Sequence, residues 1–268
     1  MAQCYHPLHH DLTMNDAIAH NRPETLNNSY LAPEISNQRL QTLDALHVQA
    51  GETILDVGCG TGFLTHELAL MAGASGKVVA MDLQAEMTDA TQERCAHLPQ
   101  VSAQTGDVTA LPFGDEEFDA VTCTQVLLYV ENVELAISEM RRVLKPGGRI
   151  AILETDWQGV VMHSQFPDIT DRIMTAWDQS VASPNLPRTI LAKMSAAGFG
   201  GLNAKAIPLL NTTFTENSFS VSSLEWLGKV GYKAGAVTKE ESLRWIQDQK
   251  ELGEKNQYFF CVNRFLFN

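Results

Sequence analysis

The amino-acid sequence contains no long apolar run and no targeting segment. No stretch approaches the roughly 20 apolar residues that a membrane-spanning helix requires. The first residues carry neither the basic segment nor the apolar segment of a secretory signal peptide. These absences predict a cytoplasmic protein that does not insert into a membrane.

Basic residues are scarce and are not clustered. The 268 residues include 19 Lys and Arg against 32 Asp and Glu, which gives a formal net charge of −13. A nucleic-acid backbone or an anionic membrane surface is bound through clustered basic side chains. The sequence therefore predicts no nucleic-acid partner and no binding to a membrane surface.

Paired cysteines are also absent. The five cysteines are scattered and include no C-x-x-C pair, so neither a zinc site nor a disulfide framework is indicated. His6, His9 and His10 lie near Asp11, but no further ligands frame them. We interpret residues 1–29 as a solvated N-terminal tail that, if it orders, does so over a bound ligand, and we predict no metal site.

What the sequence does contain is a glycine turn between an apolar run and a helical pattern. The β-prone residues 54–57 are followed by alternating glycines, Gly58, Gly60 and Gly62. Glycines in this spacing keep long side chains away and let the backbone approach a ligand closely. A helical pattern of apolar residues starts after Phe63. Strand, turn and helix together predict a small ligand above the helix N-terminus.

A dinucleotide-binding fingerprint is one interpretation of this turn. That fingerprint requires the spacing G-x-G-x-x-G, and Phe63 occupies the position of its third glycine. Asp82, at the end of the next predicted strand, is suited to bind a ribose in several nucleoside cofactors. A nicotinamide-dependent oxidoreductase therefore stays as an alternative function.

Strand and helix patterns alternate along the rest of the chain. Strands are predicted at residues 77–81, 101–104, 118–124, 149–154, 202–213 and 258–266, and a helix is predicted at residues 30–46. This alternation is typical of a mostly parallel sheet with helices on both faces. Residues 30–268 are expected to form a single domain. Residues 155–187 and 214–257 are expected to be helical insertions that form a substrate lid.

The residues around the turn resemble a known family. ILDVGCGTG (residues 54–62) matches motif I of the class I S-adenosyl-L-methionine (SAM)-dependent methyltransferases without a departure. The segment Gly106-Asp107-Val108, followed by Leu111-Pro112-Phe113, is similar to a second motif of that family. The resemblance covers residues 30–154. Within that family, the chain is similar to the methyltransferases of quinone biosynthesis and of natural-product biosynthesis. It implies a Rossmann-like, seven-stranded sheet with SAM as the cofactor.

The resemblance also implies roles for individual residues. Asp82 would accept hydrogen bonds from both ribose hydroxyls, and Leu83 would flank the adenine. Asp107 and Val108 would bind the edge of the adenine, while Thr124 and Gln125 would lie along the methionine moiety. The residues expected to contact the cofactor are Tyr30, Arg39, Asp56, Gly58, Cys59, Gly60, Gly62, Asp82, Leu83, Asp107, Val108, Thr124 and Gln125.

The catalytic residues are less defined, because the methyl group of SAM is already activated. Transfer is an in-line displacement that depends mainly on positioning, and a base is needed only if the acceptor holds a proton. The candidate bases are His163 and Asp156, with Glu154 as a third, and His20 and His66 are weaker candidates. The aromatic side chains expected to shape an acceptor pocket are those of Tyr129, Trp157, Phe166 and Trp226.

The predicted function is therefore methyl transfer from SAM to a small-molecule acceptor. A non-catalytic SAM-binding protein is an alternative from another class. The sequence does not specify whether O, N, C or S is methylated, and it is compatible with a monomer or a homodimer.

Overall fold

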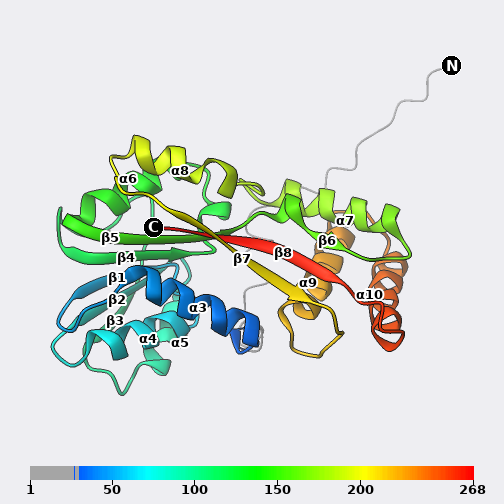
Figure 1. Cartoon of the computed structure of the whole chain (residues 1–268), viewed down its shortest axis with the longest axis horizontal. Coiled ribbons are helices and arrows are strands. Elements are labelled where there is room, and N and C mark those ends of the chain that lie inside the picture. The colour runs from blue at the N-terminus through cyan, green and yellow to red at the C-terminus, as the bar shows by residue number, and fades with distance from the viewer. Residues whose placement is uncertain (1–26, 28–29) are drawn as a thin grey trace.

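The computed structural model describes Asn27 and residues 30–268. The predictions made for the N-terminal tail, including those for its histidines and for His20, lie outside the described residues. The described residues form an open α/β sheet with helices on both faces (Figure 1). This is the architecture that the sequence predicts.

Five parallel strands form the first part of the sheet. They are β1 (Thr53–Val57), β2 (Lys77–Asp82), β3 (Val101–Thr105), β4 (Phe118–Thr124) and β5 (Leu144–Thr155). Their spatial order is β3-β2-β1-β4-β5, with β1 between β2 and β4. The carboxyl ends of these strands meet at one edge, where ligands bind in open α/β sheets.

The last strand joins the second part of the sheet to the first. β8 (Phe260–Phe267) runs antiparallel to β5, to β7 (Ala204–Asn211) and to β6 (Val161–Met162). Its later residues pair with β5, whereas its first residues pair with β6. The sheet thus has eight strands. Seven of them are the predicted ones, and the two-residue β6 is too short to give a sequence pattern.

One strand boundary differs from the prediction. Helix α6 (Val133–Val143) is capped by Asn132, as predicted, and ends before the proline and glycines. β5 nevertheless begins at Leu144, earlier than the predicted start at Arg149, because Leu144 pairs with Phe118. A register shift between this pair and the next accommodates the intervening residues as an irregularity within the strand.

Helices cover both faces of this sheet. α3 (Pro33–Leu46), α4 (Phe63–Ala72) and α5 (Ala85–Arg94) lie on one face, and α6 and α8 (Pro187–Ala196) lie on the other (Figure 1). Successive residues of β1 point to opposite faces, so Ile54 and Leu55 belong to two different buried clusters.

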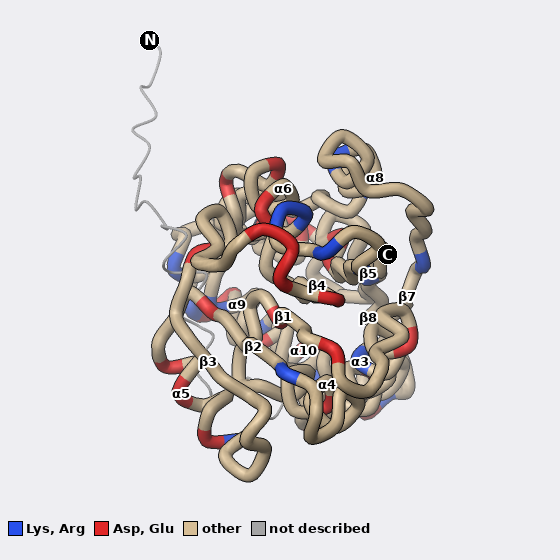
Figure 2. The backbone as a smooth tube through the Cα atoms, turned by 90° about the vertical axis from the view of Figure 1, so that its left-hand side faces the viewer, with Lys and Arg blue, Asp and Glu red and all other residues tan. Residues whose placement is uncertain are grey.

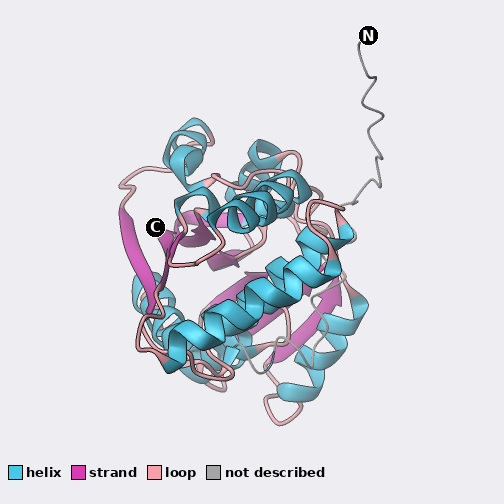
Figure 3. Ribbon diagram, turned by 90° about the vertical axis from the view of Figure 1, so that its right-hand side faces the viewer, coloured by secondary structure: helices cyan, strands magenta, loops and turns pink. Residues whose placement is uncertain are grey.

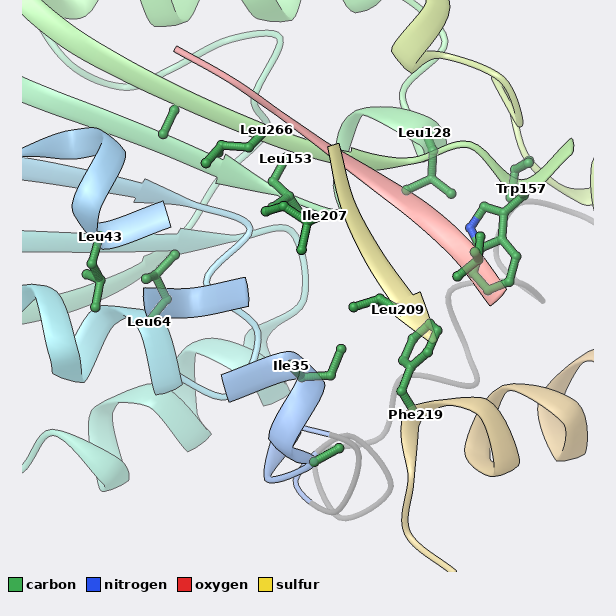
Figure 4. Packing of buried hydrophobic residues seen from close by; sticks show 14 of the residues in the cluster. Ile35, Leu43, Leu64, Leu128, Leu153, Trp157, Ile207, Leu209, Phe219 and Leu266 are labelled. Atoms are coloured by element: carbon green, nitrogen blue, oxygen red, sulfur yellow. The ribbon is translucent and has the colours of Figure 1, made fainter. Parts of the chain in front are cut away.

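Three further helices pack together beyond one end of the sheet. This three-helix cluster consists of α7 (Pro167–Ser180), α9 (Phe219–Lys233) and α10 (Lys239–Glu254) (Figures 1 and 3). The rings of Trp177 and Trp226, 4.0 Å apart at their centroids, join α7 to α9. Figure 4 shows that one hydrophobic cluster continues from Leu43 and Leu64 to Trp157 beside these helices.

The basic residues of the described part of the chain are scattered rather than clustered. Figure 2 shows Lys and Arg on separate elements of the described chain rather than along one stripe. No helix in residues 30–268 is both long and apolar enough to cross a membrane.

Candidate functional site

The glycine turn lies at the carboxyl end of the central strand β1. Gly58 and Gly60 have φ angles of +70° and +52°, which glycine adopts without a steric penalty. The backbone N–H groups of Gly58 and Cys59 donate to the carbonyl oxygen of Met81 at 2.7 and 3.0 Å. A Cβ atom on Gly58 would overlap the side chain of Val126. The turn is therefore held close to β2 and to the loop after β4.

Helix α5 packs against the outer side of the turn. Gly62 has a φ of +79°, and a Cβ atom on it would lie 2.9 Å from the Cα atom of Thr91. The Thr91 hydroxyl donates to the carbonyl oxygen of Gly60 at 2.8 Å. Arg94 Nε donates to the carbonyl oxygen of Thr61 at 2.6 Å. Gly62 thus permits close packing between the turn and α5.

Asp82 ends β2 beside the turn. Its Oδ2 atom accepts a hydrogen bond from the Gly60 N–H, and its Oδ1 atom accepts one from the Gln84 N–H, both at 3.0 Å. Burial raises the pKa of Asp82, and the backbone N–H groups of Gln84, Gly60 and Leu83 oppose this effect. Each carboxylate oxygen accepts more than one hydrogen bond. Asp82 therefore retains acceptor capacity for the two hydroxyls of a ribose.

Leu83 and Asp107 present groups that suit an adenine base. Leu83 is 61% exposed and lines the first cavity, so it offers an apolar surface beside Asp82. Asp107 Oδ1 accepts from the N–H and the hydroxyl of Thr109 at 2.8 and 2.7 Å. Its Oδ2 makes no hydrogen bond within the described residues. An apolar surface and an available acceptor match the ring and the amine of adenine.

These groups line a first cavity of about 380 Å³ at the carboxyl edge of the sheet. The predicted cofactor residues that line it are Tyr30, Gly58, Gly60, Asp82, Leu83, Asp107, Val108, Thr124 and Gln125. Gly62 does not line it, in agreement with its packing role against α5.

A second cavity of about 200 Å³ adjoins the first. It contains the remaining predicted cofactor residues, Arg39, Asp56 and Cys59, and three of the four aromatic residues predicted for an acceptor pocket, Tyr129, Trp157 and Trp226. The fourth, Phe166, lies outside both cavities, with the Arg244 guanidinium 4.3 Å from its ring centroid. Both cavities are lined by Tyr30, Gly58, Thr124, Gln125 and Tyr129.

Tyr30 and Arg39 close the side of the cavities nearest to α3. Arg39 Nη1 donates to the backbone carbonyl of Tyr30 at 2.6 Å, and its Nε lies 3.3 Å from Glu67. The Arg39 guanidinium also lies 5.1 Å from the centroid of the Phe63 ring. Burial raises the pKa of Tyr30 to about 12, so its phenol keeps its proton at neutral pH.

Asp56 and Cys59 are buried beneath the second cavity. The Thr65 hydroxyl donates to Asp56 Oδ2 at 2.6 Å. Burial raises the pKa of Asp56 to about 7 despite this hydrogen bond. Burial also raises the pKa of the Cys59 thiol, which accepts a hydrogen bond from the Thr91 hydroxyl at 3.4 Å. The protonated thiol is a poor nucleophile.

A polar network that the sequence did not predict connects the two cavities to β8. Gln125 has a φ of +58°, which is uncommon for a residue with a side chain. Its N–H donates to the carbonyl oxygen of Leu153 at 2.8 Å. The hydroxyl of Thr155 donates to Gln125 Oε1 at 2.6 Å and accepts from Arg264 Nε at 3.2 Å.

Arg264 is the residue of this site that sequence reasoning missed. It lines the second cavity and is 7% exposed. Burial lowers the pKa of Arg264 to about 10, so the guanidinium stays charged at neutral pH. One signal was present in the sequence: Arg264 is the only charged residue within the apolar strand β8. Charged residues in such strands are rare unless they have a specific partner.

The structure does not bring the candidate bases to the cavities. His163 is exposed and lines neither cavity. Asp156 also lines neither, and its two carboxylate oxygens accept from Arg188 at 2.8 and 3.0 Å. Strand β6 and helix α8 hold these side chains away from the shared lining residues, which explains the difference from the sequence prediction.

The other base candidates have different surroundings. Glu154 is fully buried and accepts from the N–H groups of Val126 and Leu127 at 2.9 and 2.6 Å. Burial raises the pKa of Glu154 to about 8. Glu154, near the end of β5, therefore anchors the loop after β4 through the backbone N–H groups of Val126 and Leu127. His66 lies on the surface of α4 with its Nε2 atom 3.3 Å from that of His97.

A metal centre is not apparent in the described part of the chain. Asn27 and residues 30–268 contain no group of three or more His, Cys, Asp or Glu side chains placed to hold an ion.

Comparisons with known proteins agree with this geometry. Residues 55–152 match the family model described as "Methyltransferase domain". The chain is 34% identical over 183 residues to a 2-phytyl-1,4-naphtoquinone methyltransferase of Thermosynechococcus vestitus, which covers 63% of this chain and 80% of that enzyme. It is 41% identical over 123 residues to the protein of the same name from Synechocystis.

Other overlaps are shorter or concern the fold alone. The match to the Synechocystis enzyme covers 44% of this chain and 51% of that enzyme, and the chain spans only 36% of another curated relative. A solved structure assigned as a methyltransferase of Bacillus halodurans superposes with a TM-score of 0.60 at 21% identity, over 86% of this chain and 97% of that one. The chain belongs to the family of S-adenosyl-L-methionine-dependent methyltransferases.

Proposed function

We propose that this protein transfers a methyl group from SAM to a small-molecule acceptor. The observation that carries this proposal is the pair of adjoining cavities with five shared lining residues. The first cavity has the acceptors and the apolar surface that suit the nucleoside of the cofactor. The second borders the glycine turn at Gly58 and Cys59 and has aromatic walls on the side of α9, which suit an acceptor.

The residues present fit the cofactor. Gly58 and Gly60 line the first cavity with no side chain between their backbone and a ligand, and Asp82 keeps acceptor capacity at the strand end. When bound, SAM would supply a methyl group attached to a positively charged sulfur. The acceptor atom would bond to the methyl carbon as the carbon–sulfur bond breaks, and the sulfur would leave as a neutral thioether. The protein's contribution is to position both partners and to exclude water.

A flat aromatic ring is the acceptor class that the second cavity supports. Trp157, Phe219 and Trp226 line it, and the ring centroids of Trp157 and Trp226 are 5.7 Å apart. Relatives that share this family are named as methyltransferases of naphthoquinones, which are planar bicyclic rings. An acidic protein with dispersed basic residues is not suited to a polynucleotide acceptor.

Neither proposed base is placed for general-base catalysis. We propose that Tyr30, Tyr129 and Gln125, which line both cavities, orient the acceptor at the boundary. An acceptor that enters already ionised needs no base. In that case the reaction depends on alignment of the acceptor atom with the methyl group.

The direct test uses SAM labelled in its methyl group. Calorimetry should show SAM binding to the purified protein, with NADH as the control ligand. Incubation with labelled SAM and a small-molecule extract should then transfer the label to an extractable compound. Binding of NADH instead of SAM would favour the oxidoreductase alternative. Tight SAM binding without transfer to any extract would favour a non-catalytic SAM-binding protein.

A further inference from the structure

Arg264 projects from β8 into the second cavity. The strand is otherwise apolar or neutral, and neighbouring residues such as Val262 and Leu266 are buried in the core. Arg264 itself is 7% exposed and lines the cavity together with Trp157, Phe219 and Trp226. A guanidinium is therefore buried in the wall of an aromatic cavity.

Within the part of the chain that the structure describes, the hydrogen-bond partners of Arg264 are uncharged. Its Nη1 donates to the side-chain carbonyl of Gln38, and its Nε donates to the hydroxyl of Thr155 at 3.2 Å. The guanidinium carbon lies 4.7 Å from the centroid of the Phe219 ring. Its third nitrogen, Nη2, makes no hydrogen bond to any described residue, and it is not sealed from solvent.

The acidic residues that act electrostatically on Arg264, Glu34 and Glu154, form no ion pair with it. Glu34 accepts from the N–H of Phe219 at 2.8 Å and from the side chain of Asn211 at 3.2 Å. Glu154 accepts from two backbone N–H groups on its Oε1, and its buried Oε2 has no hydrogen-bond partner among the described residues. Burial raises the pKa of Glu154 to about 8, so it is protonated at neutral pH. Across Asn27 and residues 30–268, no carboxylate lies within ion-pair distance of Arg264.

Arg39, which also lines the second cavity, does have a carboxylate partner. Arg39 is paired with Glu67 and lies beside Phe63, at the start of the helix that follows the glycine turn. Arg264 lies instead against Phe219, the first residue of α9, on the side formed by the three-helix cluster. The unpaired charge is therefore on the side of the cavity that we assign to the acceptor.

A buried charge without a counter-ion is unfavourable, and proteins normally compensate it with a partner of opposite sign. A bound anion supplies that partner, and a hydrogen bond from a charged donor to an anionic oxygen is among the strongest in proteins. The aromatic walls around Arg264 favour a flat ring as the carrier of that oxygen. Gln38, which is buried and bonded to Arg264, holds the guanidinium in place.

We propose that Arg264 binds an anionic oxygen of the methyl acceptor, which is an aromatic compound carrying a carboxylate or an ionised hydroxyl. This inference rests on the proposed function, because it assigns the second cavity to the acceptor. Thr155 links Arg264 to Gln125, which lines both cavities, so the anion site and the cofactor site share one hydrogen-bonded network. Arg264 thereby selects the charge state of the acceptor.

The test compares two probes of similar shape, 2-naphthoate and the neutral 2-naphthamide. Their binding is measured by quenching of the tryptophan fluorescence, with the cofactor cavity saturated by S-adenosyl-L-homocysteine. The wild-type protein should bind 2-naphthoate about tenfold or more tightly than 2-naphthamide at neutral pH. Equal binding of the two probes to the wild-type protein would overturn the proposal without the use of any variant.

Three variants locate the source of the preference. Arg264→Gln should remove it, and Arg264→Lys should keep part of it because the charge is retained. Arg141→Gln, on the distant helix α6, should leave it unchanged. A preference that persists in a folded Arg264→Gln protein would contradict the assignment.

A titration with S-adenosyl-L-homocysteine tests two other outcomes: that Arg264 binds the carboxylate of the cofactor, and that the anion site exists but the protein does not bind the cofactor. If Arg264 held the carboxylate of the cofactor, Arg264→Gln would weaken S-adenosyl-L-homocysteine binding about tenfold or more, and the naphthoate preference would be absent from the wild-type protein. If the wild-type protein preferred 2-naphthoate but bound neither SAM nor S-adenosyl-L-homocysteine, the anion site would stand and the proposed methyl transfer would fail.

Discussion

Gly58 and Val126 lie so close together that a single added carbon atom on Gly58 would overlap the Cγ2 methyl of Val126. Gly58 directly follows the central strand β1, and Val126 is the second residue of the loop after β4 and donates its N–H to Glu154. The turn after β1 is thus packed directly against the side chain of Val126, and Gly58 lines both cavities. A side chain at this glycine would force the turn and the loop apart.

We expect Gly58→Ala to abolish measurable SAM binding. The substitution combines the overlap with Val126 and a φ of +70°, which costs an L-residue about 1–2 kcal/mol by itself. Gly73→Ala is the matched control, because Gly73 has a φ of +68° with nothing near its Cβ position. Calorimetry should show normal SAM affinity for Gly73→Ala, even though its positive φ also makes a side chain unfavourable there. Normal affinity in Gly58→Ala would show that the loop is free to move.

Asp82→Ala should weaken SAM binding by about 2 kcal/mol, or roughly thirtyfold, from the loss of charge-assisted hydrogen bonds. Asp82 is the carboxylate at the end of β2, and its substitution also leaves the Gly60 N–H without its acceptor. Asp89→Ala, on the exposed side of α5, is the control and should bind normally. A folded Asp82→Ala protein with unchanged affinity would remove Asp82 from the cofactor site.

The buried Glu154 should make the protein less stable as the pH rises. Burial raises its pKa from 4.5 to about 8, so the folded protein holds a proton that the unfolded chain releases above its own pKa. The stabilisation is complete below the unfolded pKa and is lost as the pH rises through about 8. One proton contributes a slope of at most about 1.4 kcal/mol per pH unit.

Glu154→Gln should flatten this dependence, because the amide stays neutral and its oxygen still accepts from Val126 and Leu127. Urea unfolding of both proteins at several values between about pH 5 and 8 measures the slopes. Asp56, whose pKa is raised to about 7 by burial, adds a similar slope to both proteins. Parallel curves for the two proteins would mean that Glu154 is ionised in the folded state.

His163→Ala should leave methyl transfer within about twofold of the wild-type rate. The side chain is exposed and lines neither cavity, and surface substitutions of this kind change stability by about 0.5 kcal/mol or less. Turnover with the acceptor identified by labelled SAM is the measurement. A loss of a hundredfold or more in kcat would require β6 to move His163 to the cavities during the reaction.

The sequence was sufficient for the parts of the site that depend on nearby residues. Asp82 ends β2 and Asp107 lies two residues after the end of β3, so a spacing pattern places them at one edge of a parallel sheet. The glycine turn needs positive φ angles, which glycine itself signals. These features can be recognised before any long-range contact is known.

The parts that depend on distant contacts were not predictable in this way. Arg264 meets Gln38, which is 226 positions earlier in the chain, through the antiparallel register of β8. Asp156 and His163 follow β5, whose carboxyl end faces the cavities, as predicted. Strand β6 nevertheless directs His163 away from the cavities, and the ion pair to Arg188 directs Asp156 away from them. Chain position after a strand says little about where a side chain points once the chain leaves the sheet.

The division of the cavities between early and late parts of the chain has a consequence for synthesis. All residues that line the first cavity lie between Tyr30 and Asn132, whereas the second also needs Phe219, Trp226 and Arg264. As the ribosome extends the chain, every residue that lines the first cavity is made long before the second cavity can be completed. Pairing of β8 with β5 is therefore the late assembly step that brings Arg264 to the wall of the second cavity.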